Sequence, residues 1–252
     1  MKELRDGMNK TNWIFLRGLT RGNIHWGDFE SIFKKHCPNS NLEFLELPGN
    51  GTLNLEQTPT NPIEVIKILI AKSKIYSKYD SINLCGISLG GMIALKWSEL
   101  YPEKFSSVNV INTSLNQFSP FYKRLLPNNY TKILINLILK NEEKNEFFIL
   151  KTTSNKFQTT KKHLKKFSTF AKVHKITTQN ILKQLILANK IKISNPPLVP
   201  LKIICSKNDR LVHFSCSEII SKKYQGIFFI HPSAGHDLPL DEPDWLIQKL
   251  LY

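Results

Sequence analysis

The sequence has only four cysteines among its 252 residues. They are Cys37, Cys85, Cys205 and Cys216. No two of them have the C-x-x-C spacing of a zinc site, and their scattered positions argue against a disulfide framework. We therefore expect no metal site and no structural disulfide, and we expect the protein to work in a reducing compartment, the cytoplasm.

The sequence also lacks a long apolar run. The longest candidate, Ile133–Leu139, is interrupted by Asn136 and falls well short of the roughly 18 residues that a membrane-spanning helix needs. The stretch from Met1 to Lys10 is polar and charged, and Trp13–Leu16 is too short for the core of a signal peptide. The sequence therefore predicts neither a membrane span nor a secretory signal.

Size and composition indicate a folded protein. Hydrophobic residues make up 41% of the chain and aromatic residues 10%, which excludes a disordered or collagen-like chain. At roughly 150 residues per domain, the length fits one large domain or two small ones. A domain of this size buries enough surface to be stable without disulfides or metals.

Acidic residues are scarce between residues 116 and 197. This segment contains 16 Lys and Arg but only three acids, so it holds +13 of the net charge of +15 and leaves +2 for the rest. It has no glycine, and its apolar residues recur at helical spacing, as in Ile181–Ile186. We expect a helical insertion, or cap, with a basic outer face.

The flanking regions alternate short apolar runs with helical stretches. The expected strands are Trp13–Leu16, Leu42–Leu47, Ile82–Cys85, Val108–Ile111, Leu201–Cys205 and Ile227–Ile230. The expected helices are Trp26–His36, Pro62–Tyr76, Gly90–Tyr101, Ser215–Tyr224 and Asp244–Leu251. Continuous apolar runs suit strands that are buried on both faces. The sequence therefore predicts an α/β core of a mostly parallel sheet of about six strands over residues 1–115 and 198–252, interrupted by the cap at 116–197.

The most informative motif is Gly86-Ile87-Ser88-Leu89-Gly90. A predicted strand runs into it and an amphipathic helix follows it, which is the context of a G-x-S-x-G nucleophile turn. The glycines leave room where strand and helix pass close to a strained central residue. The positive end of the following helix favours a developing oxyanion. We therefore interpret Ser88 as a nucleophile.

A serine nucleophile needs a base and a group that orients the base. In this strand–turn–helix arrangement the chain order is Ser, then Asp or Glu, then His. Asp209 and His236 each follow a predicted strand in that order, and no acid follows Val108–Ile111. Because the carboxyl ends of parallel strands share one edge of a sheet, we expect these groups to converge. His213 is the competing base.

The oxyanion of such a reaction needs two backbone N–H donors. One is expected from Leu89, directly after the nucleophile. The other is expected from Leu19, where Gly18 allows a sharp turn after the first strand.

With these motifs, the sequence resembles the α/β-hydrolase superfamily over nearly its whole length. The residues that carry the resemblance are Gly18 with Leu19 and Trp26, Leu47-Pro48-Gly49-Asn50-Gly51, the motif around Ser88, Asp209, and Gly235-His236. The best fit is to small capped esterases such as the pimeloyl-acyl-carrier-protein methyl ester esterases of biotin synthesis. The resemblance implies a Ser88–His236–Asp209 triad, a helical cap over the site, and neither metal nor organic cofactor. The usual His-Gly of the first loop is Arg17-Gly18 here, which changes how that loop is held.

These features favour a serine ester hydrolase. A cap with a charge of +13 favours an anionic partner, and an ester linked to the acidic acyl carrier protein is the expected substrate. The residues expected to contact substrate are Trp26, Phe118, Phe121, Tyr122, Lys123 and Arg124.

Other functions stay open. A general carboxylesterase for short or medium chains, a thioesterase and a lysophospholipase would use the same groups. A binder without catalytic activity, such as a nucleic-acid-binding protein, is favoured only by lysine pairs such as Lys161-Lys162. No recognised nucleic-acid motif is present, so we expect an enzyme.

Overall fold

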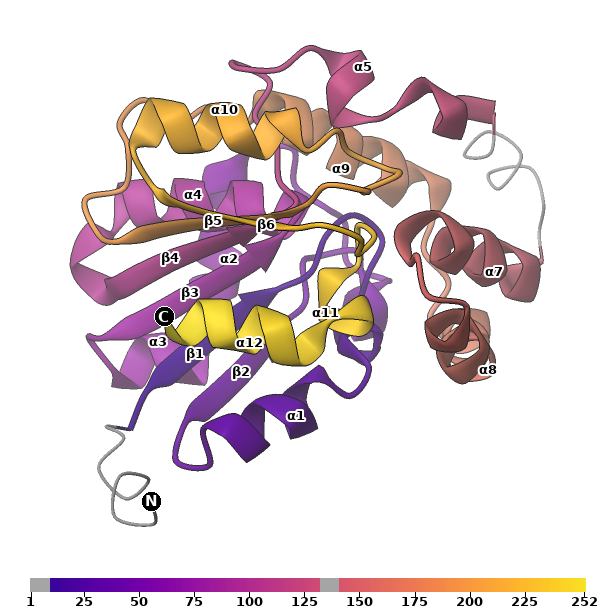
Figure 1. Ribbon diagram of the computed structural model, residues 1–252, viewed down its shortest axis with the longest axis horizontal. Coiled ribbons are helices and arrows are strands. Elements are labelled where there is room, and N and C mark those ends of the chain that lie inside the picture. Colours follow the sequence, from indigo (N-terminus) through magenta and orange to yellow (C-terminus); the bar gives the residue numbers. More distant parts are fainter. Residues whose placement is uncertain (1–9, 132–140) are drawn as a thin grey trace.

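The computed structural model describes residues 10–131 and 141–252. Its centre is a sheet of six parallel strands in the order β2-β1-β3-β4-β5-β6 (Figure 1). The strands are β1 (Asn12–Leu16), β2 (Asn41–Leu45), β3 (Ile82–Ile87), β4 (Phe105–Ile111), β5 (Leu201–Ser206) and β6 (Ile227–His231). This confirms the predicted parallel sheet. The apolar stretch Ile133–Leu139 lies outside the described residues.

The strands of the sheet centre are buried on both faces. In β1, Trp13 and Phe15 point to one face, while Ile14 and Leu16 point to the other. Side chains alternate across a strand, so a run without polar residues covers both faces with apolar groups. This explains why the core strands read as continuous apolar runs.

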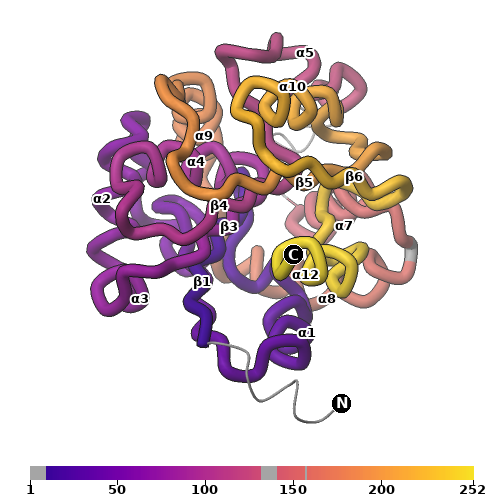
Figure 2. Tube along the Cα trace, turned by 60° about the vertical axis from the view of Figure 1, so that its left-hand side comes forward, coloured from indigo at the N-terminus to yellow at the C-terminus, as the bar shows by residue number. Residues whose placement is uncertain are grey.

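Helices cover both faces of the sheet (Figures 1 and 2). One face packs against α1 (Phe29–His36) and α12 (Pro243–Leu251), which contact each other, with α11 (Leu238–Asp241) preceding α12. The other face packs against α2 (Pro62–Lys72), α3 (Lys74–Lys78), α4 (Leu89–Leu100) and α10 (Ser215–Tyr224). In the described part of the chain, single turns of 3₁₀ helix complete the loops: η1 (Asn23–Trp26), η2 (Gly51–Leu53), η3 (Pro102–Lys104) and η4 (Pro127–Asn129).

Two of the expected helices are broken. The expected helix Pro62–Tyr76 divides at Ser73, which is extended and caps α3 by accepting a hydrogen bond from the Tyr76 N–H at 3.0 Å. The expected helix Trp26–His36 divides at Gly27, whose φ of +61° is left-handed. A serine cap and a left-handed glycine both end helical hydrogen bonding, although the apolar spacing continues past them.

The segment 116–197 lies between β4 and β5. Its described helices are α5 (Phe121–Arg124), α7 (Glu142–Thr153), α8 (Phe157–Val173) and α9 (Thr178–Lys190). Figure 1 shows α7 and α8 beyond the carboxyl ends of the strands. The lysines of α8 are exposed, namely Lys161, Lys162, Lys165, Lys166 and Lys172. Lys132 and Lys140 lie outside the described residues.

Helix α9 docks through buried polar groups beside the apolar Leu187, which is fully buried in the core. Gln184 is fully buried, donates to the Asn50 side chain at 2.6 Å and accepts from the Thr20 N–H at 3.0 Å. Asn180 accepts from the Thr58 N–H at 3.0 Å. Within Ile181–Ile186, Leu182 and Ile186 are exposed, whereas Ile181 and Leu185 are partly buried. None of the helices in residues 10–131 and 141–252 is long and apolar enough to cross a membrane.

Candidate active site

The turn after β3 holds Ser88 in a strained conformation. Its φ of 55° and ψ of −119° lie outside the backbone regions that residues other than glycine ordinarily adopt. A Cβ on Gly86 would lie 2.3 Å from the Gly90 carbonyl oxygen, and a Cβ on Gly90 would lie 2.4 Å from the Leu16 carbonyl oxygen. Both glycines are therefore required sterically, and the turn projects Ser88 from the carboxyl edge of the sheet.

Asp209 and His236 meet at the same edge. His236 Nδ1 lies 2.6 Å from Asp209 Oδ2, and both side chains are buried. The other carboxylate oxygen accepts the N–H groups of Leu211 at 2.7 Å and Val212 at 3.0 Å. An ionised carboxylate only accepts, so Nδ1 carries the proton of this bond and Nε2 is left as the acceptor of the ring. Asp209 thus fixes the orientation and tautomer of the imidazole.

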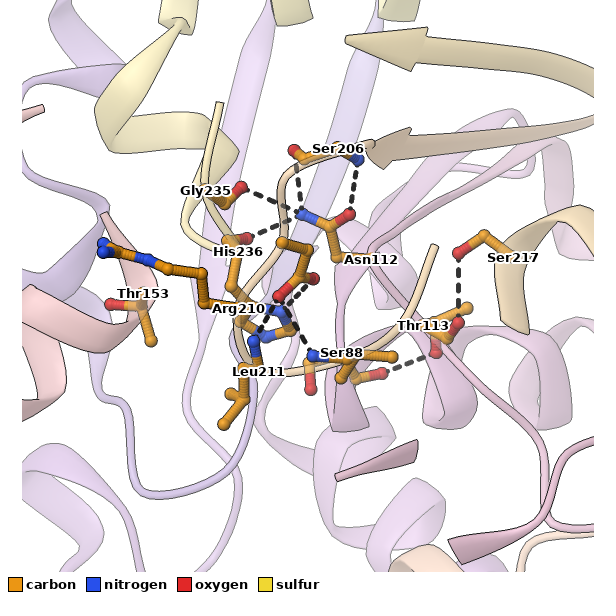
Figure 3. A network of polar contacts seen from close by, with 12 residues as sticks. Ser88, Asn112, Thr113, Thr153, Ser206, Arg210, Leu211, Ser217, Gly235 and His236 are labelled. Atoms are coloured by element: carbon orange, nitrogen blue, oxygen red, sulfur yellow. Dashed lines mark hydrogen bonds and ion pairs between the residues drawn. The ribbon is translucent and has the colours of Figure 1, made fainter. Parts of the chain in front are cut away.

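Ser88 and His236 line one cavity of about 450 Å³. Figure 3 shows them in one cluster of polar residues, with Ser88 coming from β3 and His236 from the loop after β6. Apolar side chains contribute much of the remaining wall: Leu19, Ile87, Leu89, Met92, Phe121, Leu125, Phe148, Ile149, Phe170, Ala171, Ile176, Ile181, Leu185, Ala188, Leu211 and Val212. The site therefore combines a hydroxyl and an oriented imidazole with room for an apolar group.

The loop after β1 runs directly past the serine. A Cβ on Gly18 would lie 3.0 Å from Ser88 Cβ and 3.5 Å from Ser88 Oγ. Leu19 follows in that loop, and Leu89 is the first residue of α4, where N–H groups have no partner within the helix. Both residues line the cavity. The two residues expected to supply N–H donors therefore both lie in the wall of the cavity that contains Ser88.

Arg17 connects this loop to the loop of His236. Its Nη1 and Nη2 donate to Asp237 Oδ1 and Oδ2 at 2.9 and 2.6 Å, and both side chains are 3% exposed. The Arg17 guanidinium also lies over the Trp26 ring, 5.0 Å from its centroid. This bidentate pair explains how an arginine takes the place expected of a histidine in the Arg17-Gly18 turn.

Asn112 is a site residue that the sequence alone did not reveal. It follows β4 with a left-handed φ of 46° and is 2% exposed. Its amide donates to the His236 carbonyl oxygen at 2.8 Å, and its own oxygen accepts the Ser206 N–H at 2.8 Å (Figure 3). Asn112 therefore ties the end of β4 to the end of β5 and to the His236 loop. The only available signal was its position after a strand, where an acid was sought.

Asp241 is a second residue that holds the His236 loop. It is 2% exposed, and it accepts the Gly235 N–H at 2.8 Å and the Asn155 N–H at 2.9 Å. Its other oxygen accepts the Ser154 hydroxyl at 2.5 Å. The turn after α7 is thereby fastened to the loop that carries His236, so the inserted segment contributes to holding that loop.

Two of the six expected substrate contacts line the cavity. Phe121 and Arg124 do, but the described lining residues do not include Trp26, Phe118, Tyr122 or Lys123.

Packing explains why Trp26 and Phe118 lie outside the wall. Trp26 is 2% exposed and packs among the aromatic rings of the sheet face, and Phe118 packs on the Tyr224 ring. Tyr122 is 57% exposed on α5, and Lys123 uses its carbonyl to bind the His213 N–H. The competing base His213 binds Ser215 and is likewise absent from the described wall.

Comparisons with known proteins agree with this geometry. The model of the alpha/beta hydrolase fold family matches residues 70–243 of the chain. A curated protein of Wigglesworthia glossinidia brevipalpis, a pimeloyl-[acyl-carrier protein] methyl ester esterase, is 27% identical over 255 residues, covering 94% of this chain and 91% of that protein.

Two solved structures show the same fold. A lipase-esterase related protein from Clostridium acetobutylicum has a TM-score of 0.71 at 19% identity, covering 96% of this chain and 93% of the other. The enol-lactonase from Burkholderia xenovorans has a TM-score of 0.72 at 12% identity, covering 96% and 90%.

Proposed function

This chain belongs to the alpha/beta hydrolase fold family, and we propose that it is a serine carboxylic-ester hydrolase. One observation carries the proposal: His236, which Asp209 holds at 2.6 Å, shares a cavity with the strained Ser88. The esterase name of the relative from Wigglesworthia supports the same reaction class.

The first half of the reaction acylates Ser88. Ser88 Oγ attacks the ester carbonyl carbon while His236 Nε2 takes its proton, and Asp209 stabilises the imidazolium that forms. The negative oxygen of the tetrahedral intermediate binds the N–H groups of Leu19 and Leu89. The intermediate then expels the alcohol, which receives the proton from His236, and the acyl group stays on Ser88.

The second half releases the acid. A water molecule loses a proton to His236 and attacks the acyl-enzyme carbonyl, and Ser88 Oγ leaves with that proton. The apolar wall of the cavity suits the hydrocarbon part of the acyl group.

Labelling with a fluorophosphonate tests the nucleophile. We expect one label per chain in the wild type and none in Ser88→Ala, because only an activated serine reacts. Ser106→Ala is the matched control, since Ser106 is exposed on β4 and should leave labelling intact. A wild-type chain that takes no label would favour the alternative of a binder without catalytic activity, such as a nucleic-acid binder.

For the substrate, we infer an ester carried by acyl carrier protein, such as pimeloyl-acyl-carrier-protein methyl ester. The relative from Wigglesworthia is named for that substrate, and the exposed lysines of α8 offer a basic surface to an acidic partner. A reducing, cytoplasmic location fits this substrate and stays a prediction.

Neutralising exposed lysines of α8 tests whether the enzyme recognises the carrier protein. We expect Lys161→Gln/Lys165→Gln/Lys166→Gln to raise KM for a carrier-linked ester about 5-fold at low salt, with less effect at high salt. Hydrolysis of the same ester without the carrier should not change. Lys67→Gln/Lys74→Gln/Lys78→Gln, on α2 and α3, removes the same charge elsewhere and should leave KM unchanged.

General carboxylesterase, thioesterase and lysophospholipase activities stay as alternatives within the same chemistry. A thioester is attacked by the same groups, so its leaving thiol changes no step assigned above. Equal rates on carrier-linked and free esters, without salt dependence, would favour a general carboxylesterase.

A further inference from the structure

A buried polar cluster forms part of the cavity wall and has no role in the mechanism above. It consists of Arg21 and His25, from the loop after β1, and Glu146 from α7. Arg21 Nη1 lies 2.9 Å from both carboxylate oxygens of Glu146. All three residues are at least nine-tenths buried, with 6%, 3% and 5% of their surfaces exposed. The cluster therefore joins the loop beside Ser88 to the inserted segment.

Two donors of this cluster have no partner among the described residues. Arg21 Nη2 is one and His25 Nε2 is the other. His25 Nε2 lies 3.9 Å from Glu146 Oε1, which is too long for a hydrogen bond. Arg21 Nη1 binds that same oxygen, so both side chains stand beside one carboxylate oxygen of Glu146.

The backbone identifies His25 Nε2 as a donor. His25 Nδ1 lies 3.0 Å from the Gly22 nitrogen and 3.1 Å from the Gly22 carbonyl oxygen. That carbonyl oxygen already accepts the His25 N–H, whereas the Gly22 N–H needs an acceptor. Both groups are satisfied if Nδ1 accepts, which places the ring proton on Nε2.

The charges around these donors select the ligand. Burial, with Arg21 and Arg17 nearby, lowers the pKa of His25 well below its ordinary value, so its ring is neutral. Glu146 neutralises Arg21, and Asp237 neutralises Arg17. A ligand carboxylate would face the Glu146 carboxylate, whereas an uncharged oxygen meets no such repulsion and can accept a hydrogen bond from an open donor.

We propose that Arg21 and His25 form a polar subsite that binds an uncharged oxygen, such as a ketone carbonyl, on the acyl part of the substrate. The inference rests on the proposed hydrolase function, because it places the acyl chain in the cavity that contains Ser88. It adds a selectivity that the apolar wall alone does not provide: a chain with an oxygen at one position is preferred over a plain hydrocarbon chain.

Arg124 is the internal comparison. It also lines the cavity and is buried, but its Nη1 and Nη2 donate to the Asn189 side chain at 2.7 Å and the Ala188 carbonyl oxygen at 2.8 Å, and its Nε lies 3.4 Å from Ser114 Oγ. Each nitrogen therefore has a partner. A conservative change at Arg124 should not alter selectivity for an oxygen in the chain.

The test is a positional scan with methyl esters of unbranched acids. Each ester of a given length is compared with versions in which one methylene is replaced by a ketone at successive carbons, and with a version that ends in a carboxylate. For one ketone position we expect wild-type kcat/KM to exceed that of the hydrocarbon ester about 10-fold, as for a hydrogen bond in a buried site. The carboxylate version should not be preferred.

Two variants assign the preference to the subsite. Arg21→Lys keeps a positive charge opposite Glu146 but loses the second guanidinium nitrogen. His25→Phe keeps ring packing against Phe167, which is 4.7 Å away between centroids, but loses the ring N–H. In each, the ratio of ketone ester to hydrocarbon ester should fall toward one. In Arg124→Lys the ratio should stay at the wild-type value. Thermal melting shows whether each variant folds. If one of the two does not fold, the ester preference of the other tests the subsite.

Binding separates this inference from the proposed function. The same esters are titrated calorimetrically into Ser88→Ala. A ketone preference in binding without any wild-type hydrolysis would overturn the hydrolase function and leave the subsite. Hydrolysis without a preference at any position, or a preference for the carboxylate, would overturn the subsite and leave the hydrolase. A preference that survives in both variants would also overturn it.

Discussion

The sheet-forming regions, residues 1–115 and 198–252, differ from the inserted segment 116–197 in charge and in backbone. The inserted segment has a net charge of +13 and no glycine, while the sheet-forming regions have +2 and all 11 glycines. Within the described residues, every left-handed φ also lies in the sheet-forming regions, Ser88 and Asn112 among them. The sheet-forming regions thus supply the strained backbone of the site, and the inserted segment supplies helical walls and exposed lysines.

The two regions meet through buried polar contacts. Gln184 binds the loop beside Asn50, Glu146 binds Arg21, and Ser154 binds Asp241. Polar contacts are directional, so they fix where the inserted segment stands over the cavity, whereas apolar contacts tolerate sliding. Catalysis should therefore fail when the sheet-forming regions are altered, and selectivity should change when the junction between the two regions is altered.

The largest expected effect comes from breaking the pair at the sheet edge. We expect His236→Ala to reduce kcat at least about 10⁴-fold, and Asp209→Asn to reduce it about 10³–10⁴-fold, because the base is lost or misoriented. Steady-state kinetics on a p-nitrophenyl ester measure both. Either variant with more than a tenth of wild-type kcat would contradict the assigned roles.

The next largest effect is on stability, within the sheet-forming regions. Asp237→Ala leaves the Arg17 guanidinium buried without its carboxylate, and we expect a loss of about 3–5 kcal/mol in the free energy of unfolding. Glu56→Gln is the matched control, because the Glu56–Lys72 pair at 2.8 Å is exposed and should contribute less than about 1 kcal/mol. Urea denaturation compares them, and equal losses would refute the burial argument.

A smaller effect is expected at the junction. Gln184→Ala leaves the Thr20 N–H and the Asn50 carboxamide oxygen without their partner, which should cost about 1–3 kcal/mol. Limited proteolysis should then cut the inserted segment sooner than the sheet-forming regions. Lys183→Ala, which removes only an exposed contact to Gln57, should leave the digestion pattern unchanged. If Gln184→Ala were digested faster in all regions alike, Gln184 would not act specifically in holding the inserted segment on the sheet-forming regions.

The smallest effect is the pH dependence contributed by His25. Its pKa is lowered in the folded state, so the unfolded chain binds the proton more readily once the pH falls below about 6.5. Stability should therefore fall as the pH drops from 7 toward 5, by up to about 1.4 kcal/mol per pH unit for this group. His25→Phe should show a shallower slope in urea denaturation over this range. Identical slopes would show that His25 is not held neutral.

Much of the fold followed from local signals. The strand positions came from continuous apolar runs, and the parallel α/β architecture that they predicted is confirmed. The turn at Ser88 was readable because Gly86 and Gly90 leave a sequence pattern where backbone atoms approach closely. The order of the residues along the chain and their positions after predicted strands also identified Asp209 and His236 as candidates. The structure places these two side chains in contact.

The remaining features depend on side chains that meet only after folding. The Arg21–Glu146 pair joins residues 125 positions apart, and neither partner stands in a recognisable pattern. Asn112 and Asp241 act through single amide or carboxylate groups, whose partners no spacing rule identifies. Trp26 was expected to contact the substrate, but it packs in the core. The prediction was wrong because an aromatic residue near a site has the same sequence pattern in either role.

Trapping the acyl-enzyme is the most direct test of the central claim, that Ser88 is the group that takes the acyl chain. The enzyme is quenched with acid during turnover of an activated ester, digested, and analysed by mass spectrometry. We expect the acyl mass on the peptide that contains Ser88 and on no other peptide. An acyl mass on a different residue, or steady turnover with no acylated peptide at any time, would contradict the account.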